Sequence, residues 1–425
     1  MLKIYKQSET DLLLDRLQAR AESISPQIVR SVAEIIEDVK TRGDAALRDL
    51  TERFDGIRCD SFYLSPRERE SLSEKVPPAL RKIIDTAAAN IRAFHEPQRQ
   101  SGYIMSNGGR VMGQRVIPLR RVGLYVPGGT AAYPSSVLMN AIPAKVAGVS
   151  NVVMVTPPKP EGINPAVVYA ADVAGVDEII TVGGAQAVAA LAYGTESIPR
   201  VDKVVGPGNI YVAMAKKLLY GTVDIDMIAG PSEVLIIADE EANPSYIAAD
   251  LMSQAEHDPL AAAILITTSP ELAHRVCEEI KGQIKSLSRR DIIRKSLETY
   301  GSVLVADSLE EAVRISNIIA PEHLELAVRA PFDLLGEVRN AGSIFLGDYT
   351  PEPLGDYFAG PNHVLPTNGT ARFASPLSVE SFVKKSSYIY YSKETFEAIG
   401  AEVEGFANAE GLSAHANSVT VRLKK

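Results

Sequence analysis

The 425-residue sequence has few cysteines and no long apolar segment, and each shortage excludes a class of protein. Cys59 and Cys277, its two cysteines, lie far apart and outside any C-x-x-C pattern, which argues against a disulfide framework and a thiolate metal site. Any metal ion would therefore be held by histidine, carboxylate or amide groups. No segment approaches the roughly 18 uninterrupted apolar residues of a membrane span, and the first residues lack the apolar core of a signal peptide. We therefore expect a cytoplasmic protein.

The sequence also has no excess of basic residues. Its formal net charge is −9, and no run of basic residues interleaved with aromatic residues offsets that charge. Nucleic acid is therefore excluded as the main partner, and small molecules are expected instead. With 46% apolar and 23% charged residues the chain has the composition of an ordinary globular protein, and its length predicts two or three domains.

From residue 121 onward, short apolar segments alternate with glycine-rich turns and helical patterns. Strands are predicted at 151–156, 178–182, 234–238, 263–267, 302–305 and 343–346. This alternation predicts parallel sheets covered by helices, whose ligands bind beyond the carboxyl ends of the strands. The turns at 125–129, 183–186 and 206–209 have the glycines to approach a nucleotide phosphate, but the chain has no G-x-G-x-x-G motif. On pattern alone, ordinary tight turns at strand ends explain them better than a nucleotide site does.

Residues 243–259 have the pattern of a helix that carries polar groups on its buried side. Asn243 and Pro244 form a helix-start signal, and the apolar spacing predicts that Gln254 and His257 face inward. An amide and an imidazole at i, i+3 can bind one metal ion together. Alternatively, the histidine simply bonds a carbonyl group at the end of the helix.

Two further segments carry candidate chemistry. Glu322 and His323 follow Pro321 at the start of a predicted strand, where a carboxylate and an imidazole can serve as acid and base or form an ordinary surface pair. Residues 353–367 form a long stretch without apolar periodicity, which is typical of a functional loop. At the start of the chain, the Leu12–Leu14 run fits either an arm that packs on a second subunit or a loosely held terminus.

Seven of these segments, in order, resemble the L-histidinol dehydrogenase family over nearly the whole chain. An eighth, Gly411-Leu412-Ser413-Ala414-His415, stands near the end of the chain. The seven are Leu124-Tyr125-Val126-Pro127-Gly128-Gly129, Gly183-Gly184-Ala185-Gln186-Ala187, Gly206-Pro207-Gly208-Asn209, Ala229-Gly230-Pro231-Ser232-Glu233-Val234, Ser253-Gln254-Ala255-Glu256-His257, Pro321-Glu322-His323-Leu324 and Gly360-Pro361-Asn362-His363-Val364-Leu365-Pro366-Thr367.

The resemblance implies an α/β fold with two incomplete Rossmann-like domains, parallel sheets, small helical terminal domains and an intertwined homodimer. On that basis we expect an N-terminal arm over 1–20 that packs on the partner subunit. Residues 21–124 and 234–377 would form the first Rossmann-like domain, with the metal and acid/base residues. Residues 125–233 would form the second, with the cofactor contacts, and 378–425 a small C-terminal domain. In this family the absence of G-x-G-x-x-G is normal.

The resemblance also implies a reaction and a set of site residues. The family oxidises L-histidinol to L-histidine through L-histidinal with two NAD, at the end of histidine biosynthesis, and binds one zinc ion per subunit. The implied roles are acid and base for Glu322 and His323, zinc ligands for Gln254, His257, Asp356 and the partner-donated His415, substrate contacts for Ser232, His363 and Glu410 together with His323 and the zinc ligands, and cofactor contacts for Tyr125, Gln186 and Asn209.

Three other functions compete with this interpretation. Related dehydrogenases of sulfonated propanediols have a similar scaffold, but they would need cationic groups and no imidazole-binding zinc site. A non-catalytic ligand-binding paralogue would be expected to lack Glu322 or His323, and both are present. A zinc hydrolase is disfavoured because the chain contains no H-E-x-x-H motif.

Overall fold

The computed structural model describes residues 2–21, 25–128 and 132–424. The chain divides into two compact units, one formed by 1–98 and 119–382, the other by 99–118 and 383–425. The first unit contains a six-stranded and a five-stranded parallel sheet, and the second contains a three-stranded antiparallel sheet with two helices. The predicted α/β class with two parallel sheets is confirmed. Among the described residues, no helix combines the length and apolarity needed to cross a bilayer.

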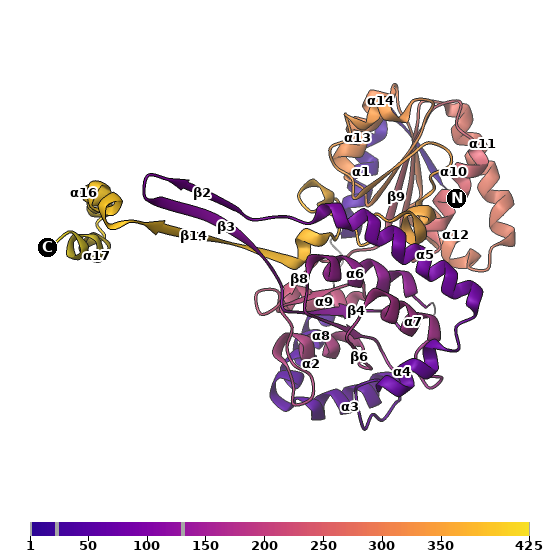
Figure 1. Ribbon diagram of the computed structural model, residues 1–425. Coiled ribbons are helices and arrows are strands. Elements are labelled where there is room, and N and C mark those ends of the chain that lie inside the picture. The colour runs from indigo at the N-terminus through magenta and orange to yellow at the C-terminus, as the bar shows by residue number, and fades with distance from the viewer. Residues whose placement is uncertain (1, 22–24, 129–131, 425) are drawn as a thin grey trace. The chain divides into compact units, whose positions relative to one another are not determined.

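The six-stranded sheet has the order β1-β11-β10-β9-β12-β13. Along β9, Val234 and Ile236 face one group of helices, while Leu235 and Ile237 face another, as the two-residue period of a strand requires. Figure 1 shows α10, α11 and α12 on one side of β9 and α1, α13 and α14 on the other. The elements are β1 (Lys3–Lys6), α1 (Thr10–Ala21), β9 (Glu233–Ala238), α10 (Pro244–Ala255), β10 (Ala262–Thr267), α11 (Pro270–Gln283), α12 (Arg290–Thr299), β11 (Ser302–Val305), α13 (Leu309–Ile319), β12 (His323–Ala327), α14 (Pro331–Leu335) and β13 (Ser343–Leu346).

The five-stranded sheet has the order β6-β5-β4-β7-β8 and is also covered on both faces. Val152 and Met154 of β5 pack in one core with α5, α6 and α7, while Val153 and Val155 pack in another with α2, α3, α8 and α9. The elements are α2 (Pro26–Arg42), α3 (Asp44–Asp55), α4 (Pro66–Ser73), α5 (Pro78–His95), β4 (Arg121–Tyr125), α6 (Pro134–Ala147), β5 (Asn151–Val155), α7 (Pro165–Ala174), β6 (Glu178–Ile180), α8 (Gly184–Tyr193), β7 (Lys203–Val205), α9 (Ile210–Leu219) and β8 (Asp224–Ile225).

The helices α2, α3 and α5 pack with this five-stranded sheet. The family resemblance had led us to expect residues 21–124 in one domain with 234–377. The buried face of α2, with Val32, Ile36 and Val39, joins the core of α8 and α9. Helical periodicity predicts that such a face is buried, but it does not specify the sheet that buries it.

The second unit pairs β14 (Val383–Tyr391) with β3 (Arg110–Pro118) and β3 with β2 (Tyr103–Asn107), followed by α16 (Lys393–Ala409) and α17 (Ser413–Leu423). The expected C-terminal domain, 378–425, was helical, so β14 and its pairing with the 103–118 hairpin were missed. Nearly every residue of β14 is exposed in the chain. A strand with two exposed faces has no alternation of buried and polar residues from which it can be recognised.

The start of the chain folds into the six-stranded sheet of its own chain. β1 pairs in parallel with β11, and Leu13 of α1 is fully buried in the core beside Leu235 and Leu304. Its neighbour Leu12 is 56% exposed. Leu13 therefore stabilises this chain directly, while contact of the 1–20 segment with a second subunit stays a prediction.

Replacing Leu13 with alanine should lower the free energy of unfolding by about 2–4 kcal/mol, because a buried leucine loses its contacts and leaves a cavity. The matched change Leu12→Ala, at the exposed neighbour, should stay within about 0.5 kcal/mol. Chemical denaturation of both variants measures the difference. Equal losses would show that Leu12 is also buried, against a second subunit.

Candidate active site

Glu322 and His323 lie at the beginning of β12, where α13 has ended and the chain enters the sheet. Both side chains are buried, with 6% and 3% of their surface exposed. The amide N–H of Glu233, the first residue of β9, donates to Glu322 Oε2 at 2.8 Å. The carbonyl oxygen of the same residue lies 2.9 Å from His323 Nδ1. The backbone of Glu233, in the neighbouring strand, thus bonds both members of the predicted acid/base pair.

These contacts determine which nitrogen of His323 can react. A carbonyl oxygen only accepts hydrogen bonds, so Nδ1 must carry the hydrogen and donate it to Glu233. In the neutral ring the lone pair is then on Nε2. Among the described residues, Nε2 is buried without a hydrogen-bond partner, and it lies 3.6 Å from Asp356 Oδ1. His323 is therefore oriented to accept a proton at Nε2.

Burial changes the protonation of the carboxyl groups around this histidine. It raises the pKa of Glu322 to about 8, an effect that the nearby His323 opposes. It raises the pKa of Glu352 to about 7, again opposed by His323. Burial by itself lowers the pKa of His323, but the charges of Glu352, Glu322 and Asp356 outweigh it, so that the net shift is upward. The site thus contains several groups that can exchange protons near neutral pH.

A group of potential metal ligands lies beside His323. His257, Glu352 and Asp356 each offer a ligand atom, and these atoms lie within 4.8 Å of one another. His257 follows α10, whereas Glu352 begins the short helix α15 (Glu352–Leu354) and Asp356 lies in the π-helical turn η4 (Gly355–Ala359). The segment at 353–367, expected to be irregular, thus contains a helical turn that directs these side chains.

Gln254 is buried at the end of α10 with its amide group beside Glu352. Its nitrogen can donate to both carboxylate oxygens of Glu352, at 2.9 and 3.1 Å. In that orientation the amide oxygen does not face Glu352 and can bind a cation. Nitrogen and oxygen donors without a thiolate suit zinc, so these residues fit the expected metal.

The sequence-based prediction of this group was wrong about one residue and omitted another. His257 was expected to face inward like Gln254, but its side chain is exposed because α10 ends at Ala255 and the helical period no longer applies. Glu352 was missed altogether. Its spacing of four residues from Asp356, which places two carboxylates on one side of a helical turn, is the signal that could have identified it.

His363 contacts Asp356 of this group, and Ser232 is the neighbour of Glu233 in the chain. His363 Nδ1 donates to the carbonyl oxygen of Asp356 at 2.9 Å, and its Nε2 lies 3.3 Å from Ser136 Oγ on α6. Ser232 immediately precedes Glu233 and is half-buried. Glu410 and His415 belong to the second unit, at the end of α16 and in the first turn of α17, and both are exposed there.

The expected cofactor residues follow three strands of the five-stranded sheet at their carboxyl ends. Tyr125 ends β4, Gln186 lies in the first turn of α8 after β6, and Asn209 caps α9 after β7. The Tyr125 hydroxyl accepts from the amide of Gly184 at 3.0 Å, and burial raises its pKa to about 12. Gln186 is buried, whereas Asn209 is exposed. Gly129, in the first expected turn, lies outside the described residues.

Comparisons with known proteins match nearly the whole chain. A family model described as histidinol dehydrogenase matches residues 18–423. A histidinol dehydrogenase of Clostridium acetobutylicum is 55% identical over 410 residues, covering 96% of this chain and 95% of that protein. One from Listeria monocytogenes is 52% identical over 425 residues, covering both chains completely.

A solved structure shares the fold at the level of the whole chain. The crystal structure of histidinol dehydrogenase from Elizabethkingia anophelis has a TM-score of 0.93 and 39% identity, and the match covers 99% of this chain and 98% of that one. The family match and the relatives thus each extend over nearly the full length. This chain belongs to the histidinol dehydrogenase family.

Proposed function

We propose that this chain is a zinc-dependent dehydrogenase that oxidises L-histidinol to L-histidine through L-histidinal, with two NAD, in the last steps of histidine biosynthesis. The observation that carries the proposal is the buried Glu322–His323 pair beside the metal-ligand group, in a chain that belongs to this family. A base and a cation site in contact suit a substrate with a hydroxyl group and an imidazole. No similar argument favours another substrate class.

The proposed zinc ligands are Gln254, His257 and Asp356, with His415 from a second copy of the chain. The zinc ion would supply a positive charge that binds the imidazole and amino groups of the substrate and fixes its position. Ser232, His363 and Glu410 would contact the substrate as well. Tyr125, Gln186 and Asn209 would contact NAD, which accepts the hydride. For these three residues the support is their common position at the carboxyl ends of β4, β6 and β7.

The protein's own residues would move protons in two oxidation steps. In the first step His323 Nε2 takes the hydroxyl proton while the hydride leaves the carbinol carbon, and its Nδ1–H keeps the bond to Glu233. In the second step Glu322 takes a proton from the water that adds to the aldehyde. The resulting hydrate anion then loses a second hydride to NAD and becomes the carboxylic acid. Two hydrides taken by two NAD, one proton taken by His323, one proton taken by Glu322 and one added water therefore account for the conversion of alcohol to acid.

Purified protein should release two NADH for each histidine formed when NAD and L-histidinol are supplied. Removal of metal with a chelator should abolish turnover, and zinc should restore it, because the substrate loses its anchoring cation. NADH absorbance and chromatography of histidine measure the ratio, with a sulfonated propanediol as the control substrate. Oxidation of the control but not of histidinol would refute the proposal.

Changing Glu322 to glutamine should damage oxidation of histidinal more than oxidation of histidinol, because only the aldehyde step needs an activated water. Changing His323 to asparagine should slow the alcohol step first. Each loss should be on the order of 100-fold or more, as for other acid–base groups. Single-turnover rates with histidinol and with histidinal separate the steps. If both variants lose both steps equally, these two roles are misassigned.

The proposed sharing of His415 between two chains predicts complementation. His415→Ala and a Glu322→Ala, His323→Ala double variant should each be inactive, yet a heterodimer contains one site with all the lesions and one with none. Random exchange of subunits should therefore restore about a quarter of the parent activity in a symmetric dimer. Mass spectrometry confirms the heterodimers. Inactive heterodimers would show that His415 serves its own chain.

A further inference from the structure

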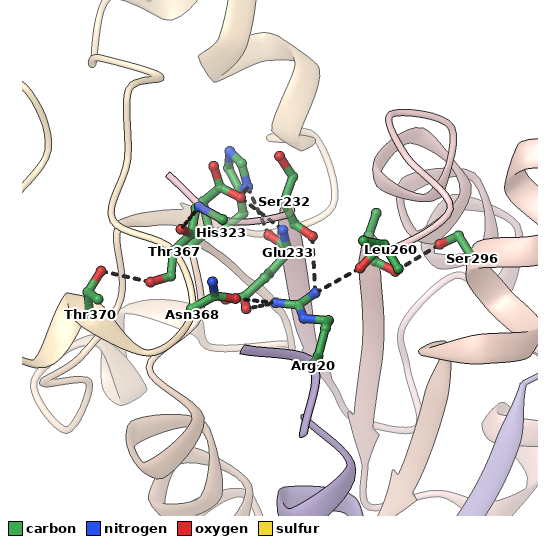
Figure 2. Close-up of polar contacts among 12 residues, drawn as sticks. Arg20, Ser232, Glu233, Leu260, Ser296, His323, Thr367, Asn368 and Thr370 are labelled. Atoms are coloured by element: carbon green, nitrogen blue, oxygen red, sulfur yellow. Dashed lines mark hydrogen bonds and ion pairs between the residues drawn. The ribbon is translucent and has the colours of Figure 1, made fainter. Parts of the chain in front are cut away.

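Arg20, in the last turn of α1, places its guanidinium group in a buried polar site below Ser232 and Glu233 (Figure 2). Only 4% of its surface is exposed, and it forms an ion pair with the equally buried Glu233 carboxylate. It also donates to Asn368 Oδ1 at 3.0 Å, to the Leu260 carbonyl at 3.3 Å and to the Ser232 carbonyl at 3.5 Å. The guanidinium group thus bonds both the side chain of Glu233 and the backbone just before it.

Glu233 is also the residue that holds the acid/base pair. Its N–H donates to Glu322 at 2.8 Å, and its carbonyl accepts from His323 Nδ1 at 2.9 Å. Figure 2 shows the Arg20 side of Glu233 and the His323 side in one view. A rotation of the Glu233 backbone would therefore loosen both groups together, so that Arg20 can act on them through Glu233.

We propose that Arg20 is a positioning residue for the acid/base pair, acting through the backbone of Glu233. This inference rests on the proposed function, because that function gives Glu322 and His323 their roles. An unpaired buried carboxylate is strongly disfavoured, so the Glu233 side chain would turn away or take up a proton if the guanidinium were removed. Removal of the guanidinium also releases the Ser232 carbonyl, to which Arg20 donates.

The same helix contains an arginine that serves as a matched control. Arg16 donates to the carbonyl oxygens of Glu298 and Thr299 and to Ser302 Oγ, which fastens α1 to α12 and β11. Among the described residues, none of the Arg16 hydrogen bonds goes to Glu233. Loss of Arg16 therefore tests what weaker docking of α1 does to the enzyme, without a change in the partners of Glu233.

The experiment compares Arg20→Ala with Arg16→Ala in the full-length protein. Arg20→Ala should lower kcat on the order of 100-fold in both oxidation steps, because both groups are displaced. Its zinc content should remain at the parent level, because the Arg20 bonds described above go to Glu233, Asn368, Leu260 and Ser232, outside the metal-ligand group. Arg16→Ala should lower the melting temperature and leave kcat per folded chain within about threefold.

Chemical rescue separates positioning from loss of structure. Guanidinium at about tens of millimolar, well below the denaturing range, should fill the space left in Arg20→Ala and restore part of kcat. Urea has a similar shape without the charge and should not. Arg16→Ala should respond to neither. Equal kcat losses in the two alanine variants, or equal rescue by guanidinium and urea, would overturn the inference.

A crystal structure of Arg20→Ala keeps this test independent of the substrate assignment. Longer distances from Glu233 N to Glu322 and from Glu233 O to His323 support the inference, and unchanged distances overturn it. If the parent protein does not oxidise histidinol, the proposed function fails, and these distances still decide the role of Arg20.

Discussion

The active site depends on how the protein stabilises several buried carboxyl groups around one imidazole. Four buried carboxyl groups lie near His323: those of Glu233, Glu322, Glu325 and Glu352. Glu233 begins β9, Glu322 precedes β12, Glu325 lies within β12, and Glu352 begins α15. Isolated charges in such surroundings are strongly disfavoured, so each group needs a hydrogen-bond donor, a cation or a proton. The protein uses all three means, and the choice at each position sets its chemistry.

The carboxyl groups have three kinds of partner: a guanidinium, backbone N–H groups, and side-chain hydroxyl or amide groups. Glu233 has the permanent charge of Arg20, and Glu322 accepts from a backbone N–H, while burial raises its pKa to about 8. Glu352 accepts from Ser253 Oγ at 3.3 Å and can accept from Gln254. Glu325 accepts from the amide of Glu352 at 2.9 Å. The pairing with Arg20 is fixed, whereas burial raises the pKa of Glu322 to about 8 and that of Glu352 to about 7, so these two groups can gain or lose a proton near neutral pH.

The candidate site residues lie at opposite ends of the strands in the two parallel sheets. The acid/base pair and Glu233 lie where β12 and β9 begin, whereas the expected cofactor residues lie where β4, β6 and β7 end. The usual rule for open parallel sheets applies only to the latter. At the amino end of β9, the backbone N–H and C=O of Glu233 bond the side chains of Glu322 and His323 at the start of β12.

The sequence was sufficient wherever a local pattern determined the structure. The Asn243 side chain caps α10 as predicted, and the strands expected at 151–156, 234–238 and 302–305 are present as β5, β9 and β11. The partners of long-range pairs were not predictable in this way. Arg20 and Glu233 are 213 positions apart, and nothing near either residue in the sequence indicates the other. The sheet that buries α2 was missed for the same reason, whereas β14 was missed because both its faces are exposed.

The segment from Glu352 to His363 departs from a regular α-helix, and this departure lets Asp356 contact both His323 and His363. Asp356 Oδ1 faces His323 Nε2 at 3.6 Å, and the Asp356 carbonyl accepts from His363 at 2.9 Å. Its carboxylate also belongs to the metal-ligand group with His257 and Glu352. A regular α-helix would commit that carbonyl to the N–H four residues later and direct side chains along fixed rows. In the π-helical turn Gly355–Ala359 the Asp356 carbonyl bonds His363 instead, so that one residue joins the proposed base, the potential metal ligands and His363, the proposed substrate contact.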